Sequence, residues 1–550
     1  MSLYVPAEKK AEGKANFERA VGRGYVADEK QPLNRRDFMK GMAAGAATLP
    51  IAAAVYFGYH KLSGEPVRAG MIGCGDEGGI LLTQHNPEFL RFVAVCDIRP
   101  TNQKRIFDGE SPWSHRVGFT KKYGANARKE IKQYDDYKKL LEDPNIEAVV
   151  IALPLHLHAQ VSIDAMKAGK HVLCEKLMAW NVEQCKQMIK TADQTGKILA
   201  IGHQRHYSLL YAHAVEVLKT GELGDIKHIR ALWHRNNTWP RYDKDGKVMV
   251  DEKTKHALYR DGWHPLISQE DRTALEGKLQ QLDYKSMEEL VRWRLIQRTG
   301  GGLMAELGSH QLDACSIFLN KVHPLAVSGI GTKSFYRDEY KDHEREVDDH
   351  VFVTFEFPGP NYYEIDAQGN RTVNVKDKDD VVVVTYSSIN TNSFEPYGEC
   401  VMGTRGTMLV EMEQNTMLYP ERDAAAPAKA TKVEVASAGA GKPAADSSST
   451  RPADLEQKKG ADSMAGPVSR GYTEEMEHFA YCIRMQQKEK TDEGRKKWQQ
   501  ALKCHGRVAM ADAVIALTSN LAMRNRQRIQ YKHAWFEAAS DATPEKDIKV

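Results

Sequence analysis

The feature that most constrains the fold of this chain is a glycine-rich turn between an apolar strand and a helix. Residues 67–72 form an apolar run that leads into Gly73, Gly75 and Gly78, and the apolar residues at 80–82 continue as a helix. In a GxGxxG turn the first glycine permits the sharp bend, the second lets the backbone approach a pyrophosphate, and the third lets the helix pack on the strand. The pattern predicts a dinucleotide-binding Rossmann unit, with the phosphates at the helix N-terminus.

A second apolar run supports this prediction. Residues 92–96 are followed directly by Asp97, about 20 residues after the glycines. An acidic side chain at this position can accept hydrogen bonds from the adenosine ribose. This placement favours NAD over NADP, although Arg99, two residues later, could blunt that preference.

Strands and helices go on alternating up to about residue 204. We expect helices at 137–142, 158–168 and 182–194, and strands at 148–153, 171–174 and 198–201. This order predicts a parallel, doubly wound sheet at 66–204, and such sheets bind ligands beyond the carboxyl ends of their strands. The predicted cofactor-binding residues are Gly73, Gly75, Asp76, Glu77, Gly78, Asp97, Pro154, His158, Glu175, Lys176 and Gln204.

The second half of the chain has a different pattern. Residues 226–233, 351–357 and 381–386 alternate apolar and polar side chains, which predicts an open, mostly antiparallel sheet in a C-terminal α+β domain at 205–535. Residues 242–290 are charged and resemble an insertion that could cover a cleft, and helices are expected at 472–484 and 501–526. Residues 422–467, rich in Ala, Lys, Ser, Pro and Gly, are predicted to form a disordered insert.

The N-terminus has the pattern of a targeting signal. Arg35, Arg36, Phe38 and Lys40 directly precede an apolar stretch over 41–59, which predicts a twin-arginine export signal at 34–60 and a periplasmic location. Small residues at 52–54 offer a cleavage site, but the apolar stretch is about long enough to span a bilayer, so cleaved and membrane-anchored forms both stay open. Residues 1–33 are polar and are predicted to be a disordered extension.

Composition excludes several other classes. The chain has 77 Lys and Arg against 74 Asp and Glu, with no basic block that would follow a phosphate backbone, so a nucleic-acid partner is not expected. The eight cysteines are scattered and form no CxxC pair, which argues against a disulfide framework or a zinc site. No metal is therefore predicted.

Five segments carry a family resemblance. They are the glycine loop, Leu153-Pro154 followed by His158, Glu175-Lys176, the sequence GHQR at 202–205, and GGLMAELGSHQLD at 301–313. With these marks residues 66–535 resemble the glucose-fructose oxidoreductase and inositol dehydrogenase family, Gfo/Idh/MocA. Two positions depart from the family pattern: Leu177 replaces a proline, so the turn that aims Lys176 is less rigidly fixed, and Glu306 replaces an aspartate.

The resemblance implies that Lys176, Glu306 and His310 surround the reacting carbon. His310 would accept the hydroxyl proton while the carbon-bound hydrogen leaves as hydride to the nicotinamide, Lys176 would stabilise the alkoxide, and Glu306 would orient these groups or set their pKa values. The spacing agrees, because Glu306, His310 and Asp313 at i, i+4 and i+7 share one face of a regular helix. The alternative is an ordinary polar pair within a helix.

Residues after the strand at 226–233 resemble a carbohydrate-facing edge, where aromatic faces stack on C–H groups and amides bind hydroxyls. A tryptophan beside a strand is as often part of the core. The predicted substrate-binding residues are Arg205, Trp233, Asn236, Asn237, Trp239, Arg241 and His310.

The leading hypothesis is an NAD(P)-dependent oxidoreductase that acts on CH–OH groups of a sugar or polyol, with NAD as cofactor and NADP possible. The twin-arginine translocase is an expected partner, and a homo-oligomer is expected through the open sheet. One alternative is glycoside cleavage by transient oxidation and elimination. Another is a non-catalytic sugar-binding protein, against which the joint presence of Lys176, Glu306 and His310 argues.

Overall fold

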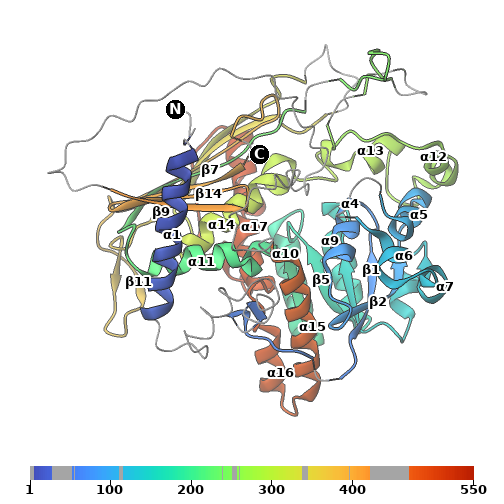
Figure 1. The fold of residues 1–550 in the computed structure, drawn as a ribbon, viewed down its shortest axis with the longest axis horizontal. Coiled ribbons are helices and arrows are strands. Elements are labelled where there is room, and N and C mark those ends of the chain that lie inside the picture. Colours follow the sequence, from blue (N-terminus) through green and yellow to red (C-terminus); the bar gives the residue numbers. More distant parts are fainter. Residues whose placement is uncertain are drawn as a thin grey trace.

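The computed structural model places two sheets side by side, each with helices packed on it (Figure 1). It describes residues 5, 7–27, 53–54, 56–62, 64–110, 116–237, 240–250, 255, 257–258, 261–336, 345–395, 397–421 and 470–549. The predicted insert at 422–467 and the arginine pair of the predicted export signal lie outside the described residues.

The N-terminal sheet has six parallel strands in the order β3-β2-β1-β4-β5-β6, which confirms the predicted doubly wound sheet. Its central strands are buried on both faces, as their continuous apolar sequences require. The short outer strand β3 was not predicted, because its three residues are mostly exposed and polar. The strands are β1 (Val67–Ile72), β2 (Leu90–Cys96), β3 (Lys132–Tyr134), β4 (Ala148–Ile151), β5 (His171–Glu175) and β6 (Leu199–Gly202).

Helices cover this sheet, and two of them come from the far end of the chain. Helix α15 (Tyr472–Lys488) packs against α4 and the strands β1, β2, β5 and β6, and α16 (Asp492–Gln499) follows it (Figure 1). The other helices are α4 (Asp76–Gln84), α5 (Pro100–Asp108), α6 (Gly118–Tyr123), α7 (Ala127–Glu130), α8 (Tyr137–Glu142), α9 (His158–Lys167) and α10 (Val182–Thr195).

The second sheet has eight strands in the order β15-β14-β13-β7-β12-β9-β8-β16, and all its pairs are antiparallel except β7 with β12. This confirms the predicted, mostly antiparallel domain. Along β12 buried and half-buried residues alternate, so one face meets the core. The strands are β7 (Ile226–Trp233), β8 (Ala326–Thr332), β9 (His350–Pro358), β12 (Val381–Ile389), β13 (Tyr397–Gly403), β14 (Gly406–Glu411), β15 (Asn415–Pro420) and β16 (Ile529–Gln530), and a separate ribbon pairs β10 (Tyr363–Ile365) with β11 (Arg371–Val375).

Helices α14 (Ser309–Phe318) and α17 (Gly506–Asn525) pack on this sheet, and α11 (Leu209–Lys219) packs against α14. A π-helical turn, Met304–Gly308, leads directly into α14. The predicted catalytic segment thus lies between the two sheets.

The predicted disorder of residues 1–33 is corrected for the part that the structure describes. Residues Ala7–Ala27 form helix α1, which packs against β15 and α11 (Figure 1). Phe17, Ala20 and Val21 recur at helical spacing and are buried in the main hydrophobic core. Composition misled because it counts the polar residues and ignores the spacing of the few apolar ones.

The end of the apolar stretch 41–59 also lies within the protein. Phe57 and Tyr59 are buried, and the Tyr59 hydroxyl donates a hydrogen bond to Glu477 of α15 at 2.7 Å. With these two residues held in the core, the stretch left for a bilayer is shorter than 41–59. In the described part of the chain, no helix combines the length and the apolar sequence that a membrane crossing needs.

Residues 261–298, which include the end of the expected insertion at 242–290, form a small cap over one edge of the Rossmann domain (Figure 1). It contains α12 (Gln269–Leu275) and α13 (Met287–Val291), whose apolar side chains form a separate cluster that also packs on Ile98. Ile98 lies two residues after the end of β2, so the cap lies at the carboxyl end of that strand, where parallel sheets bind ligands.

Candidate functional site

The glycine loop has the geometry that a bound dinucleotide needs. Gly73 has φ +96°, and a Cβ there would collide with the carbonyl of Ala152, while a Cβ on Gly78 would collide with the carbonyl of Gly73. A Cβ on Gly75, in contrast, would meet nothing closer than Arg105 at 3.9 Å. Gly75 is also the N-cap of α4, and because glycine has no side chain it cannot cap the first amides of that helix. The loop is therefore tight at its ends and open at its middle, where a pyrophosphate would approach.

Asp97 holds this loop against the end of β2. One carboxylate oxygen accepts hydrogen bonds from the Cys74 amide at 2.8 Å and from Asn102 at 3.0 Å. The other accepts from the Arg99 amide at 2.8 Å, which leaves it a further lone pair for a ribose hydroxyl. The position of Asp97 is thus fixed before any ligand binds.

Asp76, a predicted cofactor residue, is held by two arginines that were not predicted. Its carboxylate lies 2.9 Å from Arg105 and 3.2 Å from Arg116. Burial alone would raise the pKa of Asp76, but Arg116 and Arg105 lower it. Asp76 therefore stays ionised and keeps both guanidinium groups next to the glycine loop.

The loop after β5 carries Glu175 and Lys176. Glu175 is buried, accepts a hydrogen bond from the Lys176 amide at 3.2 Å, and has no partner for its other oxygen among the described residues. Burial raises the pKa of Glu175 well above its usual value, and the nearby Glu77 raises it further. Both predicted residues thus lie at the carboxyl end of β5, where the sheet would hold its ligand.

His158, another predicted cofactor residue, instead ties two loops together. Its Nδ1 lies 2.8 Å from the carbonyl oxygen of Leu177, and its Nε2 lies 2.9 Å from that of Leu153. Leu177, which fills the expected proline position, is buried. The His158 contact gives the turn after Lys176 a support that the missing proline ring does not supply.

Lys176 and Glu306 meet directly. The Lys176 ammonium donates a hydrogen bond to the backbone carbonyl of Glu306 at 3.0 Å, and the Glu306 carboxylate accepts one from Arg294 at 2.8 Å. Burial opposes ionisation of Glu306, but Arg294 and Lys176 hold its pKa below the usual value. Glu306 is therefore a carboxylate with a fixed partner. Arg294 was not predicted as a site residue, and nothing in its local sequence marks it.

His310 lies on the first turn of α14 beside these groups. It is buried, its ring centroid lies 5.5 Å from that of Trp233, and its Nε2 has no hydrogen-bond partner among the described residues. Burial, Lys176 and Arg205 together lower the pKa of His310 well below its usual value. At neutral pH the imidazole is therefore uncharged and can accept a proton.

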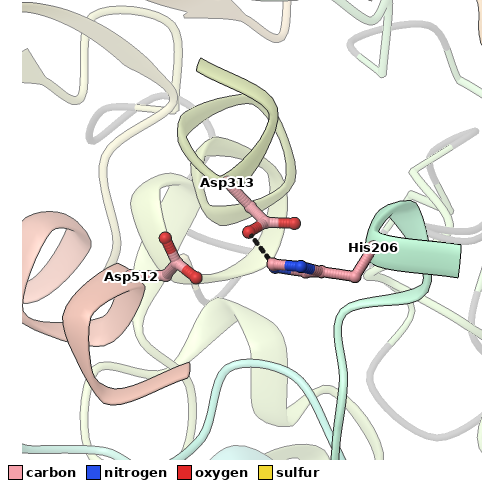
Figure 2. A group of neighbouring side chains, drawn as sticks. All are labelled: His206, Asp313 and Asp512. Carbon is pink, nitrogen blue, oxygen red and sulfur yellow. Dashed lines mark hydrogen bonds and ion pairs between the residues drawn. The ribbon is translucent and has the colours of Figure 1, made fainter. Parts of the chain in front are cut away.

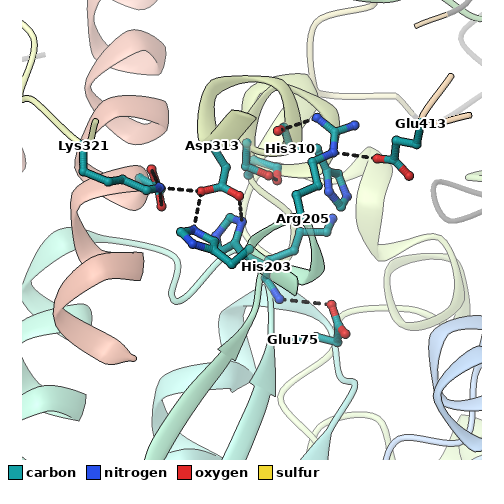
Figure 3. A network of polar contacts seen from close by, with 12 residues as sticks. Glu175, His203, Arg205, His310, Asp313, Lys321 and Glu413 are labelled. Atoms are coloured by element: carbon teal, nitrogen blue, oxygen red, sulfur yellow. Dashed lines mark hydrogen bonds and ion pairs between the residues drawn. The ribbon is translucent and has the colours of Figure 1, made fainter. Parts of the chain in front are cut away.

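Glu306 lies in the π-helical turn at 304–308, whereas His310 and Asp313 both lie in α14, so the turn alters the regular spacing expected between Glu306 and the other two residues. The carboxylate of Asp313 is engaged within the protein. Asp313 accepts hydrogen bonds from Lys321 at 2.7 Å and from His206, and lies 3.8 Å from His203 (Figure 3).

Three side chains, Asp313 among them, have the spacing of a metal site. His206, Asp313 and Asp512 have ligand atoms within 4.8 Å of one another (Figure 2). The Lys321 ammonium, however, lies 2.7 Å from Asp313 and 3.2 Å from Asp512. The pKa of Lys321 is raised by both carboxyl groups although burial opposes this, so the cation of this cluster is a lysine. The ion pairs of Lys321 link Asp313 of α14 to Asp512 of α17.

Arg205, a predicted substrate residue, is engaged elsewhere. Its side chain is 1% exposed, and its guanidinium donates to Glu413 at 2.6 Å, to Glu399 at 2.9 Å and to the backbone carbonyl of His310 at 2.6 Å (Figure 3). It also lies over the ring of Tyr211. The prediction of substrate contact is corrected: Arg205 positions α14, and its donors are used within the protein.

The other predicted substrate residues are spread along the segment after β7. Trp233 stacks on Tyr397 with ring centroids 4.7 Å apart and contacts His310 with its ring. Asn237 is buried, and its backbone pairs with Asn390. Asn236 and Arg241 are half-buried, and Trp239 lies outside the described residues.

Two further predicted cofactor residues lie at strand ends. Pro154 follows β4 and caps a short turn at Leu155–Leu157. Gln204 follows β6, is buried, and has an amide oxygen with no hydrogen-bond partner in the part of the chain that the structure describes. Such an oxygen needs a donor, and a bound cofactor could supply one.

Comparison with known proteins gives a family match on both domains. The model "Oxidoreductase family, NAD-binding Rossmann fold" of GFO/IDH/MocA matches residues 67–203, and the GFO/IDH/MocA C-terminal domain model matches residues 279–408.

Similar curated proteins include sugar and inositol enzymes. Inositol 2-dehydrogenase of Salmonella typhimurium is 27% identical over 216 residues, which cover 38% of this chain and 56% of that protein. A glycosyl hydrolase family 109 protein of Shewanella baltica is 27% identical over 254 residues, covering 42% and 51% of the two chains. The matches thus span about half the length of these relatives.

Solved structures share the fold. The WlbA dehydrogenase of Bordetella pertussis, in complex with NADH and UDP-GlcNAcA, aligns with a TM-score of 0.51 at 14% identity, covering 86% of this chain and 99% of that one. An oxidoreductase domain protein of Kribbella flavida gives 0.51 at 15%, covering 86% and 100%.

Proposed function

Because the chain belongs to the GFO/IDH/MocA family of oxidoreductases with an NAD-binding Rossmann fold, we propose that it transfers a hydride between a CH–OH carbon of a sugar or polyol and a nicotinamide cofactor. The observation that carries this proposal is the uncharged, buried His310, with an unpartnered Nε2, next to Lys176 and Glu306. The inositol dehydrogenases among its relatives support a polyol or sugar substrate.

The roles of the side chains follow from their charge states. The nicotinamide, when bound, supplies the hydride acceptor. His310 takes the hydroxyl proton, because it is uncharged and its Nε2 has no hydrogen-bond partner among the residues that the structure describes. The Lys176 ammonium stabilises the negative charge that develops on the substrate oxygen. The backbone carbonyl of Glu306 accepts a hydrogen bond from Lys176 and so positions the ammonium, while Arg294 fixes the Glu306 carboxylate.

The glycine loop and the strand ends fit the cofactor. Gly75 leaves space for a pyrophosphate, Asp97 keeps a lone pair for a ribose hydroxyl, and Gln204 presents an unpartnered oxygen. These residues would hold the dinucleotide along the carboxyl ends of β1, β2 and β6.

Product analysis tests the proposal. The protein is incubated with a panel of sugars, inositols and aryl glycosides, with and without added NAD⁺, and the products are identified by mass spectrometry. We expect a ketone or lactone two mass units lighter than one panel member, formed together with reduced cofactor. A panel that yields neither oxidised nor cleaved product would contradict the proposal and favour a sugar-binding protein without catalysis.

A second candidate is glycoside cleavage by transient oxidation, in which a ring hydroxyl is oxidised to a ketone, the neighbouring C–H proton is removed, the aglycone leaves with a proton, water adds to the unsaturated ketone, and the hydride returns to the ketone. The similarity to the family 109 glycosyl hydrolase of Shewanella baltica favours it. Free aglycone released from an aryl glycoside without net cofactor reduction would identify this reaction.

We also propose that the protein is exported by the twin-arginine route and forms a homo-oligomer. The arginine pair at 35–36 before an apolar stretch supports the first. Ile330 of β8 and Phe352 of β9 are paired neighbours in the sheet with 59% and 48% of their surfaces exposed, which supports a subunit contact on the outer sheet face.

A further inference from the structure

The cap formed by residues 261–298 makes its most specific polar contact with Arg99. The carboxylate of Asp271, on α12, lies 2.9 Å from both Nε and Nη2 of Arg99. Arg99 follows Asp97 by two residues, and its amide donates to the Asp97 carboxylate at 2.8 Å. It occupies the position from which a Rossmann protein can bind the 2′-phosphate of NADP.

Asp271 is fully buried and is fixed from several sides. Besides Arg99, it accepts hydrogen bonds from the amide of Thr101 at 3.1 Å and from the hydroxyl of Thr101 at 2.7 Å. The amide of Asp271 in turn donates the N-cap hydrogen bond of α12 to the hydroxyl of Ser268 at 3.0 Å. The carboxylate is therefore pre-positioned, and it balances the charge of Arg99 through Nε and Nη2.

We infer that Asp271 is a specificity-determining residue: by holding Arg99, it makes the site select NAD over NADP. A 2′-phosphate would have to share the guanidinium of Arg99 with Asp271, whose carboxylate already balances its charge and takes Nε and Nη2, so it gains less from Arg99 than from an unpaired arginine. The phosphate would also approach the carboxylate of Asp97. Two carboxylates would then repel the phosphate, and one arginine would attract it. The 2′-hydroxyl of NAD needs only an acceptor, which Asp97 provides.

The inference refines the proposed function, since it names which nicotinamide cofactor the site takes. It also gives the cap a role, because α12 contacts the cofactor domain at the turn that reads the ribose. From the sequence alone, Arg99 could weaken the preference for NAD. Its contact with Asp271, 172 residues away in the chain, removes that reason to expect NADP binding.

Equilibrium titration with NAD⁺ and NADP⁺ tests it. We expect the wild-type protein to bind NADP⁺ at least about 100-fold more weakly than NAD⁺, and Asp271→Asn to strengthen NADP⁺ binding by about tenfold with little change for NAD⁺. In the double variant Arg99→Met with Asp271→Asn, this gain should vanish, because it depends on the released guanidinium. Glu270→Gln, exposed on the same helix, is the matched control and should bind both nucleotides as wild type does.

Thermal melting checks that the variants are folded. If Asp271→Asn melts early, Asp271→Ser, which keeps an acceptor for the Thr101 amide, carries the same expectation. Equal wild-type affinity for both nucleotides, or an unchanged preference in the folded Asp271 variant, would overturn the inference. Failure of the wild-type protein to bind either nucleotide would instead overturn the proposed function.

Discussion

At the scale of single residues, the chemistry of the site depends on charged side chains from different helices and strands that shift one another's pKa values. Lys176 comes from the end of β5 and His310 from α14, and the ammonium of the first lowers the pKa of the second. The glycine loop, Asp97, Lys176, Glu306 and His310 were all predicted from sequence, because each lies in a motif or at a strand end, and their role in the reaction stays a prediction. Arg294, Asp271 and Lys321 were missed, since their roles arise only from partners distant in the chain.

The pH dependence of activity tests the charge coupling. His310 must be uncharged to accept a proton, and its lowered pKa keeps it so from neutral pH down to well below the usual histidine value. Lys176→Met removes a positive charge that opposes imidazolium, so the pKa of His310 rises and the acid limb of kcat/KM moves to higher pH. The rate should also fall by about 10²- to 10⁴-fold.

Lys190→Met, an exposed lysine of α10, is the control and should leave both the rate and the profile unchanged. An acid limb at the same pH in Lys176→Met and wild type would contradict the assignment of His310 as the base.

At the scale of elements, periodic segments were predicted best. The bounds of β7 and α8 agree with the sequence pattern to the residue, because each has a clean apolar period and a clear end. The hairpins of β13, β14 and β15 were not predicted, since their apolar residues do not alternate regularly, and the π-helical turn before α14 leaves no sign in a helical pattern. Helix α1 was masked by its polar composition.

A single substitution should detach helix α1 from β15 and α11. Phe17→Asp buries an unpaired charge against β15 and α11, which costs several kcal/mol, so α1 should detach and become sensitive to limited proteolysis. The core of the protein should stay intact, as measured by mass spectrometry of the fragments. Lys14→Asp, exposed on the same helix, should cleave as slowly as wild type. Equal protection of α1 in both variants would argue against the packing of Phe17.

At the scale of the whole molecule, both ends of the chain are used to build the domains around the site. α1 packs on β15 and α11, and α15 completes the Rossmann domain, so segments more than 400 residues apart in sequence each cover one of the two sheets. Such packing cannot be derived from local patterns, which fix each element but not its distant partner.

The proposed export route concerns the whole molecule. Replacing both Arg35 and Arg36 by lysine should leave a folded enzyme in the cytoplasm, because the signal is read as an arginine pair. Cell fractionation followed by an assay of each fraction measures this. If the double variant still reached the periplasm, the twin-arginine proposal would be wrong, while the site and its chemistry would be unaffected.

The central claim is hydride transfer at Lys176, Glu306 and His310, and single-turnover cofactor reduction tests it most directly. Wild-type protein, His310→Ala and the exposed-histidine control His533→Ala are loaded with NAD⁺ and mixed with the substrate that product analysis identifies, and the near-ultraviolet absorbance of reduced nicotinamide is followed in time. All three should bind the nucleotide equally, and His310→Ala alone should reduce it about 10²- to 10⁴-fold more slowly. Reduction by His310→Ala at the wild-type rate would contradict the account.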